Sequence, residues 1–127
     1  MDGSGHRALV ERYLAAYNGF DVDAMLALLA PGVRFENHSG GRLTAQADGI
    51  AQFRALAEQA CTLFAEREQR LLGLDLAPAA ATARIAWRGR LAVDLPDGPP
   101  AGTELALEGT TEFHFDGDRI AAIIDRG

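Results

Sequence analysis

The sequence predicts an α+β fold in which an antiparallel sheet packs against helices on one of its faces. Up to about residue 65, apolar residues mostly recur at the three- and four-residue spacing of amphipathic helices. Beyond that point they alternate with polar residues, as in strands that bury one face. The 127 residues contain no repeat or linker and suit one hydrophobic core, so we expect a single domain over residues 1–127.

Three segments of the first half carry helical spacing: Ser4 to Asn18, Asp21 to Pro31, and Asp48 to about residue 65. Between the last two, residues 33–38 alternate and predict a strand, with Phe35 and Asn37 on one face and charged side chains on the other. The stretch 39–47 is polar and contains glycine, which predicts a loop.

Four strands are predicted in the second half: residues 66–76, 81–93, 104–115 and 119–126. The link 94–102 holds three prolines and two glycines and predicts a long hairpin loop. Residues 116–118 read Asp-Gly-Asp and predict a tight turn. A strongly bent sheet against three helices leaves a concave space, which is the default site for a small molecule.

The composition excludes several classes of partner and chemistry. The net charge is −6, which argues against binding to nucleic acid or to an anionic membrane surface. All 12 basic residues are arginine, so Schiff-base catalysis by lysine is excluded. Cys61 is the single cysteine, which precludes an internal disulfide and fits a reducing compartment; we expect it to be a buried small apolar residue. Without an apolar run of membrane-spanning length or a signal-peptide pattern, we expect a cytoplasmic protein.

The segment VERYLAAYNGFDVDAMLALLAPGVRFEN (10–37) contains a helix ending in YN-hydrophobic-Asp, a helix ending in L-A-P, and a strand reading F-E-N. With the Gly49-Ile50 start of the third helix and the closing hairpin 110–123, it resembles the nuclear-transport-factor-2-like superfamily, which includes ketosteroid isomerases and SnoaL-type polyketide cyclases. The resemblance implies a cone-shaped, curved antiparallel sheet wrapped around three helices and a deep pocket. It also implies a homodimer formed through the outer face of the sheet, and chemistry without a cofactor.

Within this superfamily, the ketosteroid isomerases imply roles for three residues. Their catalytic tyrosine falls on Tyr13, whose hydroxyl could donate a hydrogen bond to a developing oxyanion. Their general-base aspartate falls on Asn37, and an amide cannot take up a proton. Their second oxyanion donor falls on Thr111, a weaker donor. The loss of the base argues against steroid isomerisation by that mechanism.

SnoaL-type cyclases place their acid–base aspartate on the last strand, close to the position of Asp125. If Ile123 and Asp125 share the inward face, burial raises the pKa of Asp125 toward the range of a useful general base. Tyr13 or Asn37 would then hold the carbonyl oxygen of the ligand. The alternative is equally open: Asp125 lies next to Arg126 near the end of the sequence and could form a surface ion pair.

The same inward faces supply candidate binding residues for an apolar ligand: Tyr17, Phe35, Phe53, Trp87, Thr111 and Phe113. Most large apolar side chains must form the core, because so small a domain cannot line a cavity with all of them. Tyr13 could likewise be a core tyrosine whose hydroxyl bonds to a neighbour, and Asn37 could cap the following loop. We expect no metal site, since the three histidines are scattered along the chain.

Charged side chains alternate along two predicted neighbouring strands. Glu108, Glu112 and His114 lie on one, and Arg84, Arg88 and Arg90 on the other. Opposite charges on adjacent strands suit a solvated or dimer-facing outer surface.

The interpretation we favour is a SnoaL-like protein that holds a small apolar or carbonyl-containing ligand and possesses cofactor-free isomerase, cyclase or dehydratase chemistry. Asp125 is the expected base, and Tyr13 and Asn37 the expected donors. The alternative is a non-catalytic ligand-binding or protein-interaction module of the same fold, because fold does not fix function.

Overall fold

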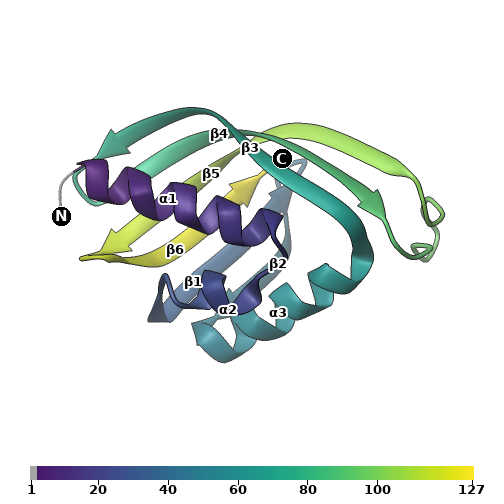
Figure 1. Cartoon of the computed structure of the whole chain (residues 1–127), viewed down its shortest axis with the longest axis horizontal. Helices are drawn as coiled ribbons and strands as arrows, with labels where there is room; N and C mark the ends of the chain where they lie inside the picture. The colour runs from purple at the N-terminus through teal and green to yellow at the C-terminus, as the bar shows by residue number, and fades with distance from the viewer. Residues whose placement is uncertain (1–2) are drawn as a thin grey trace.

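The computed structural model describes residues 3–127, with side chains from Gly5 onward, as three helices on one face of a curved six-stranded sheet (Figure 1). The helices are α1 (Gly3–Asn18), α2 (Val22–Leu26) and α3 (Gly49–Leu63). The strands are β1 (Leu29–Ser39), β2 (Arg42–Asp48), β3 (Phe64–Ala77), β4 (Ala80–Leu91), β5 (Glu104–Asp116) and β6 (Arg119–Arg126). The predicted α+β class is confirmed, as are the long loop before β5 and the tight turn between β5 and β6.

The sheet is mixed, whereas the sequence predicts a wholly antiparallel one. In the order β2-β1-β6-β5-β4-β3, only β1 and β6 run parallel. These two strands stand near opposite ends of the sequence, so the path of all the elements between them sets their relative direction. No local pattern records such a long-range pairing.

The predicted loop at 39–47 is wrong, because Arg42–Asp48 forms the edge strand β2 against β1. Gly40 and Gly41 have φ angles of 59° and 80°, which allow the chain to reverse between the two strands. The only β2 side chains turned inward are those of Ala45 and Ala47. Alanine gives a weak apolar signal, so the alternation of this strand is hard to see in the sequence.

The second helix is also shorter than its spacing predicts. It ends at Leu26, and the chain enters β1 at Leu29 instead of continuing to Pro31. Leu28 and Leu29 are nevertheless buried, as a helical face would have made them. The burial of Leu28 and Leu29 therefore does not by itself distinguish a helix from a strand in this short segment.

The apolar core fills the space between α1 and the sheet strands β5 and β6. Val10, Phe113, Ile120 and Ile123 have no exposed surface. His6 is also buried there and stacks on Phe115, with ring centroids 4.1 Å apart. This packing holds α1 against β5 and β6, the strands that carry Thr111 and Asp125.

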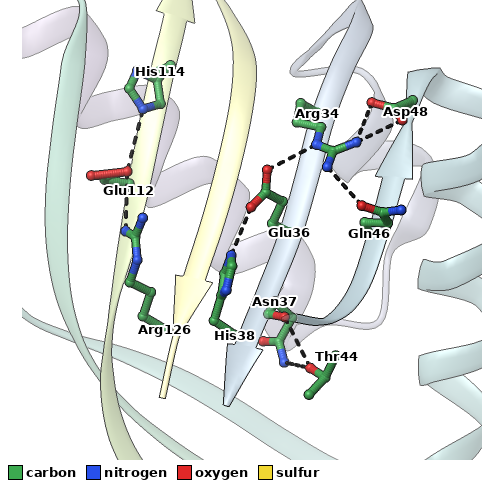
Figure 2. Close-up of polar contacts among 10 residues, drawn as sticks. All are labelled: Arg34, Glu36, Asn37, His38, Thr44, Gln46, Asp48, Glu112, His114 and Arg126. Atoms are coloured by element: carbon green, nitrogen blue, oxygen red, sulfur yellow. Dashed lines mark hydrogen bonds and ion pairs between the residues drawn. The ribbon is translucent and has the colours of Figure 1, made fainter. Parts of the chain in front are cut away.

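The outer face of the sheet carries a network of charged side chains around β1 (Figure 2). Glu36 accepts from Arg34 at 3.1 Å and contacts the His38 ring nitrogen at 2.8 Å, while Arg34 also binds Asp48 at 2.8 Å. The strand alternation predicted for residues 33–38 is therefore confirmed, because these charged side chains point away from the helices.

The sequence predicts charge pairs between β4 and β5, but in the structure the charged residues of these strands pair with other partners. On β5, Glu112 contacts His114 at 3.6 Å and Arg126 of β6 at 3.3 Å (Figure 2). The β4 arginines pair instead with β3: Arg88 with Glu68 at 3.0 Å, and Arg90 with Glu66 at 3.2 Å. Each pair occupies directly opposed register positions, which bring the side chains together.

No helix in the described part of the chain is long and apolar enough to cross a membrane.

Candidate functional site

A cavity of about 480 Å³ lies between the concave face of the sheet and the three helices. Every helix and every strand contributes to its wall. Most lining side chains are apolar: Met25, Phe35, Phe53, Leu56, Leu63, Phe64, Ile85, Trp87 and Leu107. The polar lining residues are Tyr13, Tyr17, Asn37, Ser39, Arg67, Gln69, Thr110, Thr111, Asp125 and Arg126. An apolar cavity with a few convergent polar groups is typical of small-molecule sites.

Asp125 is half-buried in the wall of this cavity, on β6. Thr111 stands directly opposite on β5 and donates a hydrogen bond of 2.6 Å from Oγ1 to Asp125 Oδ1. Burial raises the pKa of Asp125 to about 6, and the bond from Thr111 acts in the opposite direction. Arg126 points elsewhere, to Glu112. The surface ion pair between Asp125 and Arg126 is therefore not formed.

Tyr13 projects from α1 into the same cavity and packs edge-on against Phe113, with ring centroids 5.8 Å apart. Burial, followed by the charge of Asp125, raises its pKa well above 10, so the hydroxyl keeps its proton. Tyr13 is only 4 % exposed, and no described residue forms a hydrogen bond with its hydroxyl. Tyr13 is therefore free to donate to a ligand, unlike a core tyrosine bonded to its neighbours.

Tyr17 lies one helical turn further along α1 and is held by its neighbours. Trp87 Nε1 donates a hydrogen bond of 2.9 Å to the Tyr17 hydroxyl. The Arg67 guanidinium lies 3.8 Å from the centre of the Tyr17 ring. Burial raises the pKa of Tyr17, while the Arg67 charge and the Trp87 bond oppose that shift. Tyr17 thus forms a fixed wall of the cavity.

Asn37 reaches the cavity, but its amide is engaged within the β1–β2 hairpin (Figure 2). Its Nδ2 donates to Thr44 Oγ1 at 2.8 Å and to Ser39 Oγ at 3.4 Å. In this geometry the Asn37 amide does not donate to a ligand. The alternative, that Asn37 caps the turn that follows it, fits better. The edge strand that the sequence does not reveal provides Thr44, which is why this partner could not be predicted.

Five of the six candidate binding residues line the cavity: Tyr17, Phe35, Phe53, Trp87 and Thr111. Phe113 does not, because its side chain is completely buried beneath Tyr13 in the core. Phe113 lies two residues further along β5 than Thr111 and stands opposite Ile123, which is also fully buried. The shared face of β5 was identified correctly, but the boundary between cavity and core along it was not.

Arg67 and Gln69 are cavity residues that sequence reasoning missed. Arg67 is only 6 % exposed although it stands in the charged run Glu66–Arg70 of β3. Its inward direction could have been found from parity, since Leu71 is an apolar residue four positions along the same strand. Cys61 of α3 is half-buried rather than fully buried, and its sulfur lies 3.7 Å from Arg67 Nη2.

Comparison with solved structures finds the same fold in several bacterial proteins. A protein of Xanthomonas campestris pv. campestris, described as a candidate polyketide cyclase, is 22 % identical with a TM-score of 0.84, over 98 % of this chain and 90 % of that chain. A protein of unknown function from Burkholderia pseudomallei, described as nuclear-transport-factor-2-like, is 19 % identical with a TM-score of 0.79, over 98 % and 90 % of the two chains.

A third similar structure, from Catenulispora acidiphila, is described as having a ketosteroid isomerase-like fold and contains trimethylamine. It is 18 % identical with a TM-score of 0.77, over 92 % of this chain and 82 % of that chain. No functionally curated protein matches the sequence. The sequence profile of the SnoaL-like domain matches residues 10–123, nearly the whole chain, and the chain therefore belongs to the SnoaL-like domain family.

Proposed function

We propose that this protein binds a small, mainly apolar carbonyl compound in its cavity and catalyses cofactor-free proton transfer on it. The observation that carries the proposal is Asp125: a cavity carboxylate with a pKa raised to about 6 by burial. A carboxylate of this kind is a stronger base than an exposed one and is still ionised at neutral pH. It is the only carboxylate side chain among the described residues that line the cavity.

Tyr13 and Asp125 supply complementary parts of such a reaction. The protonated Tyr13 hydroxyl donates to the carbonyl oxygen and stabilises the negative charge that develops there. Asp125 removes a proton from the carbon next to the carbonyl, while Thr111 holds its Oδ1 and orients the carboxyl group. The bound enolate then receives the proton at another carbon, attacks an electrophile within the same molecule, or expels a leaving group. These outcomes correspond to an isomerase, a cyclase and a dehydratase.

The family supports this class of chemistry without specifying the reaction. Similar folds carry descriptions as candidate polyketide cyclases, and one from Streptomyces galilaeus is described as a candidate hydroxylase. Asn37 stands at the position where the ketosteroid isomerases have their general-base aspartate. Its amide cannot accept a proton and is bonded to Thr44, so it cannot serve as the base here. We therefore assign the base to β6 rather than to β1.

The experiment uses a substrate that needs only a desolvated base. 5-Nitrobenzisoxazole loses its ring C–H proton to a base, its N–O bond breaks, and the coloured phenolate is followed by absorbance. We expect the wild-type rate to rise with pH, with a midpoint of about 6, because Asp125 acts only when ionised. The Thr111→Val variant should move the midpoint upward, since it removes the bond that lowers the pKa. A wild-type rate no greater than that of free acetate would support the non-catalytic binding module instead.

We also propose that the chain forms a homodimer through the outer face of its sheet. Arg34, Glu36, Glu112 and Arg126 there make charged pairs that are still partly exposed. In a dimer with a two-fold axis, the arginines of one copy could pair with the glutamates of the other. Light scattering at micromolar concentration should give twice the chain mass at low salt and a smaller value at high salt. A monomer under both conditions contradicts the proposal.

A further inference from the structure

Arg67 is the one arginine of the described residues whose side chain is buried. It is 6 % exposed, and no described carboxylate lies within ion-pair distance of it. The other described arginines of the sheet are exposed or half-buried; Arg34, Arg88 and Arg90 are among them and pair with Asp or Glu. Burying an unpaired ion is unfavourable, so an arginine in an apolar cavity points to a counter-charge that no described residue supplies.

The guanidinium is held firmly but is only partly satisfied. Nε donates to the backbone oxygen of Tyr17 at 3.1 Å, and Nη2 makes a long contact of 3.7 Å with the sulfur of Cys61. An arginine has five N–H donors, and no described residue accepts a hydrogen bond from Nη1. Arg67 lines the cavity, so a molecule inside it can reach this residue.

Two aromatic rings fix the orientation of this cation. The centroid of Tyr17 lies 3.8 Å, and that of Phe20 4.5 Å, from the central guanidinium carbon. Phe20 has a φ of 55°, which is an unfavourable backbone conformation for a bulky residue. Strain of this kind persists where the surrounding structure enforces it, and here it accompanies the placement of an aromatic ring on Arg67.

We propose that Arg67 is the anchor for an anionic oxygen group of the ligand, and that the natural ligand is an apolar carboxylic acid. The planar guanidinium matches a carboxylate in shape and can bind both of its oxygens. The apolar body would then lie along Trp87 and Phe64, which pack edge-on with centroids 5.4 Å apart in the cavity wall.

This inference deepens the proposed function by naming its substrate class. It depends on the proposed function in one respect only, namely that the reacting carbonyl group of the ligand lies beside Asp125. The charges of Arg67 and Asp125 shift the pKa of Tyr13 in opposite directions, so both act on the same region of the cavity. Arg67 does not form an ion pair with Asp125, and it therefore stays available to the ligand.

The test compares two probes of the same shape, 2-naphthoate and the uncharged 2-naphthamide, by isothermal titration calorimetry. The Arg67→Gln variant should bind 2-naphthoate at least ~10-fold more weakly than the wild type, because a charge-assisted hydrogen bond is lost. Its affinity for 2-naphthamide should stay close to that of the wild type. Arg70→Gln is the matched control, since Arg70 is exposed on the same strand and should affect neither probe.

A ratio of naphthoate to naphthamide affinity that is the same in the wild type and in Arg67→Gln overturns the inference. Arg67 also packs on Tyr17 and Phe20, so the wild-type complex provides a second test that needs no variant. Its crystal structure should place the carboxylate of 2-naphthoate about 3 Å from Nη1 or Nη2, and a carboxylate bound elsewhere contradicts the inference. An Asp125→Asn protein separates the two proposals: it should lose proton transfer and still bind 2-naphthoate.

Discussion

Replacement of Asp125 by asparagine is expected to lower the rate of 5-nitrobenzisoxazole cleavage by about 100-fold or more. The amide keeps the size of the carboxyl group and its ability to accept a bond from Thr111, but it cannot take up a proton. The remaining rate should show no midpoint at about pH 6, because the group that titrates there in the wild type is gone. Stopped-flow or steady-state absorbance over a range of pH measures both effects.

We expect the Asp125→Asn variant to stay folded, so that loss of folding would not explain such a result. The folded-state pKa of Asp125 is raised from 3.8 to about 6, so the folded protein binds a proton more tightly than the unfolded chain. Ionisation of this group therefore lowers the free energy of unfolding as the pH rises through that interval. At about pH 8 the Asn variant should be at least as stable as the wild type in urea unfolding.

The matched control is Glu112→Gln, which makes the same type of change on the neighbouring strand. Glu112 lies on the outer face, where it contacts His114 and Arg126 (Figure 2). This variant should keep the wild-type rate and midpoint. Equal losses in the two variants would show that a general change of charge, rather than the cavity carboxylate, controls the reaction.

Gly109→Ala is expected to damage both stability and the site. A methyl group on Gly109 would overlap the backbone oxygen of Arg126 and lie 3.2 Å from the Cα of Gly127. These are backbone atoms, so the end of β6 has to move, and Asp125 moves with it. We expect a loss of about 2–4 kcal/mol in the free energy of unfolding, measured in urea, and a lower rate of base catalysis.

Gly32→Ala is the control for this change. Gly32 is also in the sheet, on β1, and a methyl group there would meet nothing within 4 Å. It should leave stability and rate close to those of the wild type. If Gly109→Ala were equally harmless, the close approach of β5 to the end of β6 could not be what positions Asp125.

Local patterns were enough to predict much of the fold. The helical spacing of α1 and α3 and the alternation of β3 to β6 are strong because large apolar side chains mark the buried face. The sequence pattern was weak in two elements. The inward residues of β2 are alanines, and α2 is too short to show a helical period. The parallel pairing of β1 with β6 depends on contacts across the whole chain, so no segment alone encodes it.

Strand alternation and family resemblance predicted which residues face inward, but not how deep in the fold each of them lies. Alternation from Ile123 places Asp125 inward, and the structure agrees with that direction. It could not separate Thr111, in the cavity, from Phe113, in the core, because both share one face and differ only in depth. Arg67 was missed because it stands in a charged run, and only its parity with Leu71 marks it as inward.

The central claim is that Asp125 is a desolvated carboxylate inside the cavity. Carbon-13 NMR titration of the aspartate side-chain carboxyl groups, with Asp125→Asn used to assign the signal, measures its pKa directly. A value of about 6 is predicted for the wild-type protein. A value near 3.8, as for an exposed aspartate, would contradict the claim and remove the basis for assigning Asp125 as the base.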